Sequence, residues 1–313
     1  MGEVTKRQHY VWRKYLRAWS TSNDQICSLL IDQNKVVRVN LMGVAQSKYF
    51  YKMTELPPEQ VDIIEEYIQR LPLVLQGIAF DFLRCYKSYS ELSFQYRTAP
   101  ASLSHVNNIE EELRNIEIQT FEKIHGAIES FGEELVECDS AESLKGIVYD
   151  EEKYSQAMTF LCIQYSRTNA MRVRFEDSMR ERPTVFSVVE NAWPLLSIIT
   201  GFQICYGIMH NNPSFFYIEN NTGEPFITGD QPLINSVGED VDSEGLAKDL
   251  VFYYPLSPYS AIIIEFYKEE GRPIHLISAD KEFVEKYNSL IVQNANSFVF
   301  ANDSSLLERY LKQ

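Results

Sequence analysis

The middle of the chain carries apolar residues at helical spacing. From Glu59 to about Leu92 they recur three and four positions apart, which predicts an amphipathic helix, and Pro72 is expected to kink or split it. Pro57 and Pro58 stand just before this helix, where proline suits a first turn. The same spacing predicts helices over 109–136, 154–175 and 184–210, a short turn and helix over 8–20, and a last helix over 304–311.

Short runs rich in β-branched and aromatic residues flank this helical region. Two such runs, joined by the turn residues QNK, predict a β-hairpin within 25–40. Because helices and strands are segregated along the chain, the sequence predicts an α+β fold rather than a doubly wound α/β fold. Further strands, expected to form an antiparallel sheet, are predicted over 214–220, 224–229, 250–256, 259–267, 273–278 and 296–301.

We therefore expect one domain over residues 1–313, since 313 residues can bury a substantial core. Its parts are an N-terminal motif helix and hairpin over 1–55 and a central helical block over 56–212. The remainder, 213–313, is expected to be mainly antiparallel β-structure with a C-terminal helix.

The charge of the chain is acidic and uneven. Its 44 acidic and 29 basic residues give a net charge of −15, which argues against a protein that coats nucleic acid without sequence preference, because such binding depends on cations. Residues 1–19 nevertheless carry five basic side chains against one acidic, whereas residues 109–153 carry 14 acidic against four basic. A local basic cleft near the N-terminus is therefore compatible with the acidic total.

Other features narrow the class of protein. The five cysteines are scattered without a CxxC pair, which favours reduced thiols in a cytoplasmic protein. The polar N-terminus lacks the apolar core of a signal peptide, and the apolar stretch 193–209 is interrupted by proline and glycine, so we expect a buried core helix and no membrane association. The common P-loop, dinucleotide, zinc-protease and nucleophile-elbow motifs are all missing from the sequence.

Five fragments together resemble a known family. They are QHYVWRKYLRAW from Gln8, QYSRT from Gln164, PFITGDQP from Pro225, YPLSP from Tyr254, and Asn288 followed by NA and FVFA up to Ala301. Their order is similar to that of bacterial domain-of-unknown-function family 4238, which has an N-terminal His-Tyr-Val-Pro motif. Trp12, Asn169 and Gly229 replace a Pro, a Pro and a Ser of that pattern. Some members lie near bacterial anti-phage defence genes, so the resemblance implies a toxic or nucleic-acid-directed effector.

The N-terminal motif supplies the first candidate site residues. Arg13 and Arg17 are four positions apart on one helix face, where like charges repel unless an anion or carboxylate lies between them. We interpret them as a phosphate-binding pair, with His9 beside them as a general acid or base. The structural alternative is that both arginines pair with acidic groups of the helical block and His9 is a hydrogen-bonded structural histidine.

Four further polar residues are candidates. Gln164 and Arg167 are three apart on a helix, so they are neighbours, and the guanidinium suits phosphate or an internal carboxylate. Glu117 lies at the edge of an apolar stripe, where an unpaired carboxylate is costly; it is a candidate partner of Arg167, metal ligand or base. Asp230 follows a predicted strand, a frequent place for site residues and also for local turns. The other histidines, including His125, are expected to be surface or core residues.

Two hypotheses of different classes follow. The first is an enzyme that acts on a phosphodiester or a nucleotide, such as a nuclease, with His9 transferring protons. Arg13, Arg17, Gln164 and Arg167 would bind the substrate. Glu117 and Asp230 would orient water or bind a metal ion, and their oxygen atoms favour Mg²⁺ or Mn²⁺.

The second hypothesis is a non-catalytic sensor or interaction module, with a protein of a defence system as its partner. Its motif residues would form a buried, fully hydrogen-bonded polar network. A transferase that binds a nucleotide cofactor through the same arginines also fits the sequence.

Overall fold

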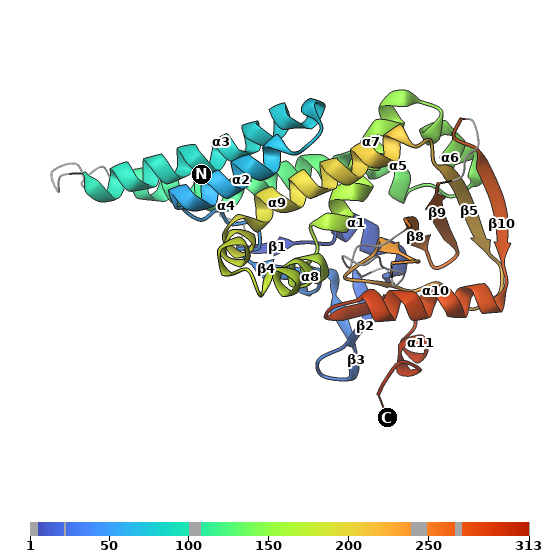
Figure 1. The fold of residues 1–313 in the computed structure, drawn as a ribbon. Helices are drawn as coiled ribbons and strands as arrows, with labels where there is room; N and C mark the ends of the chain where they lie inside the picture. The colour runs from blue at the N-terminus through green and yellow to red at the C-terminus, as the bar shows by residue number, and fades with distance from the viewer. Residues whose placement is uncertain (1–5, 22, 100–107, 239–248, 267–270, 313) are drawn as a thin grey trace.

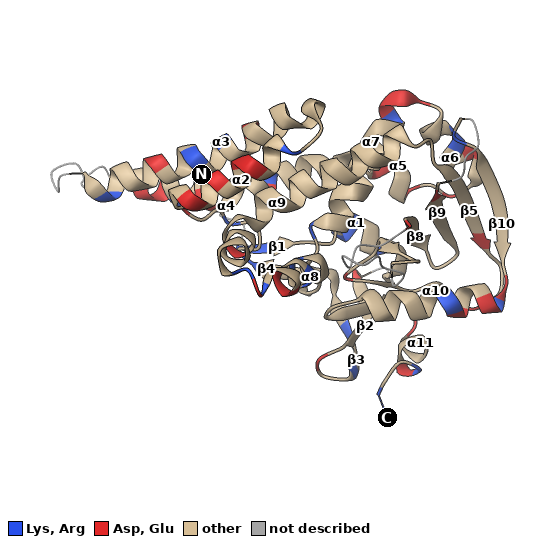
Figure 2. Cartoon of the chain, in the orientation of Figure 1, with Lys and Arg blue, Asp and Glu red and all other residues tan. Residues whose placement is uncertain are grey.

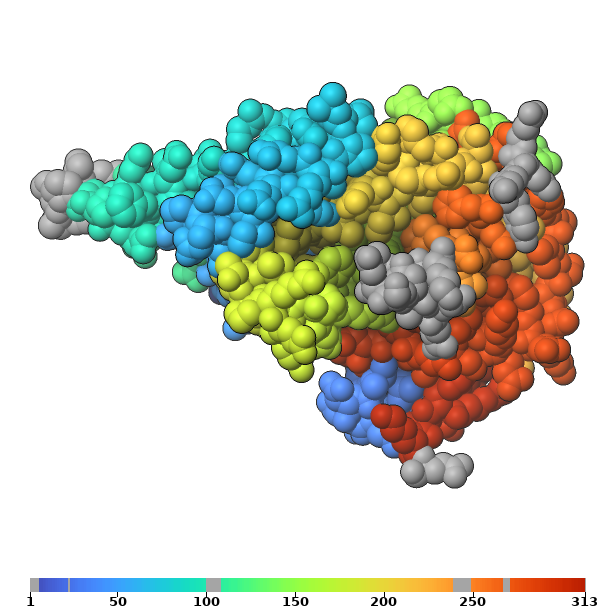
Figure 3. Space-filling model, viewed as in Figure 1, coloured from blue at the N-terminus to red at the C-terminus, as the bar shows by residue number. Residues whose placement is uncertain are grey.

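The structure is a computed structural model of the full chain and describes residues 6–21, 23–99, 108–238, 249–266 and 271–312. A tapering helical end projects from a broader part that contains most of the β-structure (Figure 1, Figure 3). Helices and strands are segregated along the chain, so the predicted α+β fold is confirmed.

The helical block follows the apolar pattern of the sequence. Helix α2 (Pro58–Gln69) begins directly after Pro57, and Pro72 separates it from α3 (Leu73–Thr98), as predicted. Helix α9 (Pro183–His210) is long and apolar enough to cross a membrane, yet 56% of its most apolar window is buried inside the protein. It therefore packs as a core helix, chiefly against α7 (Glu151–Ser166).

Two predicted helices are each broken in the structure. The helix expected over 109–136 ends as α4 (Ile109–Ser130), and a short α5 (Glu133–Val136) follows after Gly132. The helix expected over 154–175 is interrupted at Thr168, whose side chain caps the new helix α8 (Asn169–Met179) by accepting from the Met171 amide. Helix α6 (Ala141–Val148) was missed.

The strands within the described residues form three sheets. The predicted hairpin, β2 (Gln25–Leu30) and β3 (Lys35–Asn40), is confirmed, and β2 also pairs with β11 (Phe298–Ala301) near the C-terminus. Strand β6 (Thr228–Gly229) completes this four-stranded sheet, and it is much shorter than the strand predicted over 224–229. The N-terminal and C-terminal parts of the chain therefore share one sheet.

The five-stranded sheet contains β5 (Ser214–Asn220), β7 (Ile234–Asn235), β8 (Val251–Ser257), β9 (Ser260–Glu265) and β10 (Ile274–Ala279). Their order across the sheet is β10-β5-β9-β8-β7. Its pairs are antiparallel except that of β10 and β5, which is parallel and differs from the prediction. Strand β9 ends at Glu265 opposite Ser214, the start of β5, and β10 begins at that same end on the other side of β5. Helix α10 (Lys281–Asn294) follows β10 along the chain, and helix α11 (Ser304–Glu308) follows β11.

The N-terminal segment is anchored in the middle of the molecule. Strand β1 (Arg7–His9) pairs with β4 (Gln46–Lys48), and α1 (Arg13–Leu16) follows. The buried Tyr15 hydroxyl hydrogen-bonds to Pro255 of the five-stranded sheet and to Thr228 of the four-stranded sheet. The Trp19 indole donates to the Phe226 carbonyl at 2.9 Å. These contacts fix α1 against both sheets and thereby orient the residues that precede it.

The close packing of α7 and α9 gives a test of the fold. A Cβ atom at Gly201 would lie 2.6 Å from Ile163 Cγ1 and 2.9 Å from its Cα, whereas a Cβ at Gly207 would meet nothing within 4 Å. We expect Gly201→Ala to lower the free energy of unfolding by about 1–3 kcal/mol through overpacking. The control, Gly207→Ala on the same helix, should raise it by up to about 1 kcal/mol. Urea denaturation measures both, and equal effects would contradict this packing.

Candidate functional site

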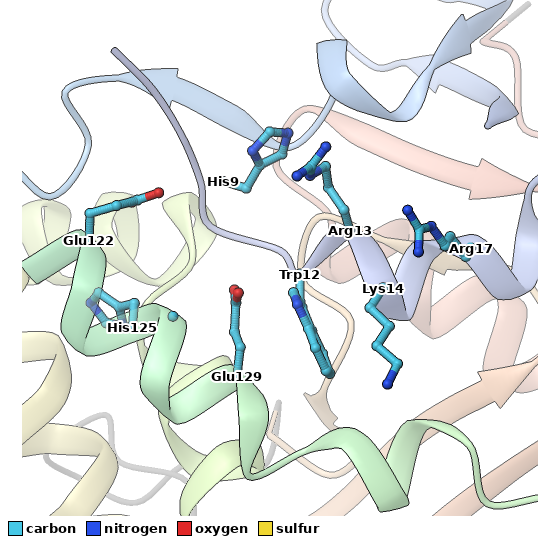
Figure 4. A pocket seen from close by; sticks show the side chains of 9 residues that line it. His9, Trp12, Arg13, Lys14, Arg17, Glu122, His125 and Glu129 are labelled. Atoms are coloured by element: carbon cyan, nitrogen blue, oxygen red, sulfur yellow. The ribbon is translucent and has the colours of Figure 1, made fainter. Parts of the chain in front are cut away.

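A polar cavity of about 280 Å³ lies between the N-terminal segment and helix α4 (Figure 4). Glu122, His125 and Glu129 are three, four and seven positions apart, so one face of α4 forms a wall of the cavity. In Figure 4, Glu122 and Glu129 extend from α4 toward the space below His9 and Arg13. The complete lining is His9, Trp12, Arg13, Lys14, Arg17, Glu122, His125, Gly126 and Glu129.

Backbone contacts hold the N-terminal segment over this wall. Gln8 is fully buried; its side-chain amide donates to the Ile118 carbonyl at 2.8 Å and accepts from the Tyr51 amide at 2.7 Å. The Tyr51 hydroxyl donates to the His9 carbonyl at 3.2 Å, and Gln164 donates to the Tyr10 carbonyl at 3.0 Å. Residues on both sides of His9 are thus tied down, which fixes its backbone at the cavity.

Arg167 is buried, with 1% of its surface exposed, and contacts Glu129 of the cavity wall. Its Nη2 atom donates to Glu129 Oε1 at 2.6 Å and to Gln164 Oε1 at 2.8 Å. The predicted proximity of Gln164 and Arg167 is therefore confirmed. Among the described residues, Arg167 Nε and Nη1 are buried without a hydrogen-bond partner. The ion pair joins the end of α7 to α4. It leaves the N–H groups on Nε and Nη1 of the buried Arg167 without an acceptor among the described residues.

The carboxylate that pairs with Arg167 is Glu129, so the proposed Glu117–Arg167 pair is wrong. Glu117 instead forms an ion pair with Lys52 at 2.8 Å, and its carbonyl accepts from the Met53 amide. It lies outside the cavity lining. Glu117 and Glu129 are 12 positions apart, and spacing on a helix cannot by itself show which turn faces a residue on another helix.

Burial moves the pKa values of the cavity groups in opposite directions. It lowers the pKa of His9 to about 4; the positive charges of Arg13 and Arg167 add to the effect, and backbone hydrogen bonds with Leu41 and Met42 oppose it. It raises the pKa of Glu122 to about 7, helped by the negative charge of Glu129 and opposed by Arg167. At neutral pH the His9 imidazole is therefore neutral, and a large fraction of Glu122 is protonated.

His125 has an unusual environment for a buried histidine. It is 2% exposed, its ring lies 4.0 Å from the ring of Tyr51, and neither ring nitrogen has a hydrogen-bond partner within the described ranges. Burial, and then Arg167, holds its pKa well below the usual range. His125 is a core residue, as expected, yet it also lines the cavity. The Nε2 atom of His9 is likewise buried without a partner among residues that the structure describes.

The cations at the rim are mostly neutralised. Lys14 lies 2.7 Å from Glu137 and 3.6 Å from Glu133, and Arg17 lies 3.6 Å from Asp24. Arg13 contacts the Met42 sulfur, and no described carboxylate lies within ion-pair distance of it. Figure 2 shows lysine and arginine residues spread over the whole molecule rather than gathered in one stripe. Arg13 is therefore the rim cation left for an anionic ligand.

Asp230 lies away from the cavity lining. It is fully buried after β6, and its two oxygens accept from the backbone amides of Asn296 and Ser297, both at 2.8 Å. Burial raises its pKa to about 6, although these hydrogen bonds oppose the shift. The contacts hold the turn that leads into β11. The described parts of the chain contain no group of three or more His, Cys, Asp or Glu residues arranged to hold a metal ion.

Sequence reasoning missed Glu122 and Glu129. Both lie beside the apolar stripe of α4. Their positions three before and four after His125 indicate that all three lie on one helix face, and this was the only sign of a site in the sequence of α4. Acidic side chains are so frequent between residues 109 and 153 that this spacing was not distinctive. Only the facing N-terminal segment distinguishes these two carboxylates from the solvent-exposed ones.

Comparison with known proteins identifies a family and no activity. The model of the family described as "Protein of unknown function (DUF4238)" matches residues 7–78 and 202–305, which is more than half of the chain. His9, Arg13 and Asp230 lie inside the matched segments, whereas α4 and Arg167 lie between them. No curated protein and no solved structure matches the chain.

The Arg167 ion pair yields a prediction about stability and pKa. Arg167→Ala leaves the Glu129 carboxylate without its partner, so we expect the free energy of unfolding to fall by about 3–5 kcal/mol. Arg172→Ala, which removes a partly exposed pair with Glu176, should cost about 1 kcal/mol or less. The loss of a positive charge should also raise the pKa values of His9 and Glu122, measurable by NMR titration. Similar stability losses for both variants would contradict the buried pair.

Asp230 should make stability depend on pH. Its folded-state pKa of about 6 lies above its usual value of 3.8, so its contribution is complete below about pH 4 and is lost as pH rises through 6. Relative to Asp230→Asn, the wild-type protein should lose about 2–2.5 kcal/mol between pH 4 and pH 7.5. Denaturation of both proteins across this range tests it. A constant difference between them would show that burial does not perturb Asp230.

Proposed function

The chain belongs to the DUF4238 family, and we propose that it is a hydrolase that cleaves a phosphoester bond in a nucleotide or nucleic acid by general acid–base catalysis. One observation carries the proposal: a proton acceptor and a proton donor line the same cavity. His9 is neutral, and Glu122 has a pKa of about 7. Opposite perturbations of two titratable groups are a pattern typical of acid–base pairs.

The reaction assigns one proton transfer to each residue. A water molecule attacks phosphorus while the His9 imidazole takes its proton. The bond from phosphorus to the leaving oxygen breaks, and Glu122 donates its proton to that oxygen. Exchange with solvent then returns a proton to Glu122 and removes one from His9. Arg13, the rim cation without a carboxylate partner in the described chain, holds the phosphate oxygens.

Substrate charge also explains how His9 gains basicity. The positive charges of Arg13 and Arg167 lower the pKa of His9 in the free protein. A phosphate bound between Arg13 and His9 offsets these charges, so the pKa of His9 rises toward its ordinary value when substrate is present. The acceptor is therefore activated by the same anion that it helps to hydrolyse.

The charge distribution favours a small substrate over duplex nucleic acid. One uncompensated rim cation among the described residues suits one phosphate group, whereas binding along a polyanion depends on many cations. The volume of about 280 Å³ also lies at the small end of ligand pockets. Cleavage of a polymer would instead make the protein a nuclease-like effector of the kind that the family resemblance implies.

A second candidate function, a non-catalytic interaction module, has its own support. Gln8, Gln164 and Asp230 all hydrogen-bond to backbone groups of distant segments, so much of the motif set acts as a structural network. In that case the network would only position the N-terminal segment for a protein partner. Retention of biological effect by His9→Ala would favour this function.

The first experiment is hydrolysis of nucleotides, single-stranded DNA, supercoiled DNA and RNA from pH 4 to pH 9. We expect kcat/KM to rise with deprotonation of His9 above pH 4 and to fall above pH 7 as Glu122 loses its proton. His9→Ala and Glu122→Gln should each reduce it by about 10²–10⁴-fold. His210→Ala, at an exposed helix end, is the matched control.

Parallel reactions with EDTA, Mg²⁺ and Mn²⁺ determine whether a metal ion is required. Glu117→Gln and Asp230→Asn then test the two residues first considered as metal ligands. Undiminished hydrolysis by His9→Ala, or no hydrolysis of any substrate by folded protein, would overturn the proposal.

A further inference from the structure

We propose that Trp12 is a stacking platform for a nucleobase, so that the ligand of this cavity is a nucleotide rather than a phosphorylated compound without a base. This inference rests on the proposed function for the position of the phosphate. The acid–base pair concerns only the phosphate group, and Trp12 identifies the nucleobase as the other part of the ligand.

Trp12 stands at the start of α1, between His9 and Arg13 in sequence. Its backbone is extended (φ −63°, ψ 126°), and it occupies the N-cap position without making a side-chain cap. The indole is partly buried and lines the same cavity as both neighbours. In Figure 4 it points down the cavity, with Lys14 on one side and Glu129 on the other.

Packing holds the indole in this position. Its ring makes an edge contact with the buried Phe160, with centroids 5.6 Å apart and an interplanar angle of 66°. Lys14 Nζ lies 5.7 Å from the indole centroid and is itself fixed by Glu137 at 2.7 Å. The lysine thus lies over the indole on one side, and Glu129, which lines the same cavity, lies on the other side in Figure 4. A rigid aromatic face loses little conformational entropy when it binds a second ring.

The charges place the two parts of a nucleotide at different ends. Arg13 and His9 form the end that accepts an anion. Toward Trp12 the facing wall carries the carboxylate of Glu129, which would repel a second phosphate group. An uncharged flat ring with N–H donors suits this end, because it stacks on the indole and its donors face carboxylate oxygens. A nucleobase combines these properties and carries the phosphate at a fixed distance.

The tryptophan content of the protein provides a specific signal. The chain has three tryptophans, and Trp19 and Trp193 are 0% and 1% exposed. Quenching of tryptophan fluorescence by an added base therefore reports on Trp12. The probes are AMP and ribose 5-phosphate, which share the sugar phosphate and differ in the base. Both are titrated by calorimetry into the Glu122→Gln protein, in which the proposed proton donor is absent and turnover is slow. Calorimetry is used because it also measures ribose 5-phosphate and the variants without Trp12, and quenching by AMP adds a signal of stacking where Trp12 is present.

With Trp12 present, AMP is expected to bind about 10-fold or more tightly than ribose 5-phosphate, as stacking on an aromatic side chain predicts. Trp12→Leu should reduce this preference to less than about threefold, and Trp12→Phe should keep most of it. Ribose 5-phosphate should bind all three proteins equally, which shows that the leucine variant is folded. Equal binding of the two ligands with Trp12 present, binding of neither, or an undiminished preference in Trp12→Leu would overturn the inference.

The outcomes separate this inference from the proposed function. A preference for AMP that depends on Trp12, without hydrolysis of any phosphoester by the wild-type protein, keeps the base site and rejects the hydrolase. Hydrolysis that depends on His9, without a preference for AMP, does the reverse.

Discussion

The buried charge of Arg167 determines how the middle of the molecule is arranged. Removing a guanidinium from water costs several kcal/mol unless it is paired and hydrogen-bonded, so Glu129 on α4 and Gln164 on α7 must both reach it. Because Gln164 also holds the Tyr10 carbonyl, the same cluster fixes the N-terminal segment. The two walls of the cavity are thus positioned by one ion pair.

The positive charge of Arg167 also acts on the two residues that we propose as proton acceptor and proton donor. It lowers the pKa of His9 and opposes the rise in the pKa of Glu122, while burial acts on both. The two effects together leave a neutral imidazole and a carboxyl group that titrates near neutrality in one small cavity. A structural ion pair and a candidate acid–base pair are therefore parts of one electrostatic system, and a variant of the first is expected to change the second.

The local pattern of apolar residues predicted which segments form helices and strands better than it predicted where helices end and which strands pair. Apolar periodicity and Pro72 located α2 and α3 correctly, because helix formation depends on nearby residues. The break at Thr168 was not predicted, since the apolar pattern continues across it and only a side-chain cap marks the new helix. The parallel pairing of β10 was missed for a similar reason: strand propensity does not specify which side of β5 a returning strand will join.

The sequence by itself determined the α+β class, the family, and the closeness of residues a few positions apart, such as Gln164 and Arg167. Helix geometry brings such neighbours together whatever the remainder of the chain does. Only the tertiary structure decided that Glu129 rather than Glu117 pairs with Arg167, and that Glu122 and His9 line one cavity. These contacts join segments more than 35 residues apart, so they depend on how whole helices pack, which local spacing does not encode.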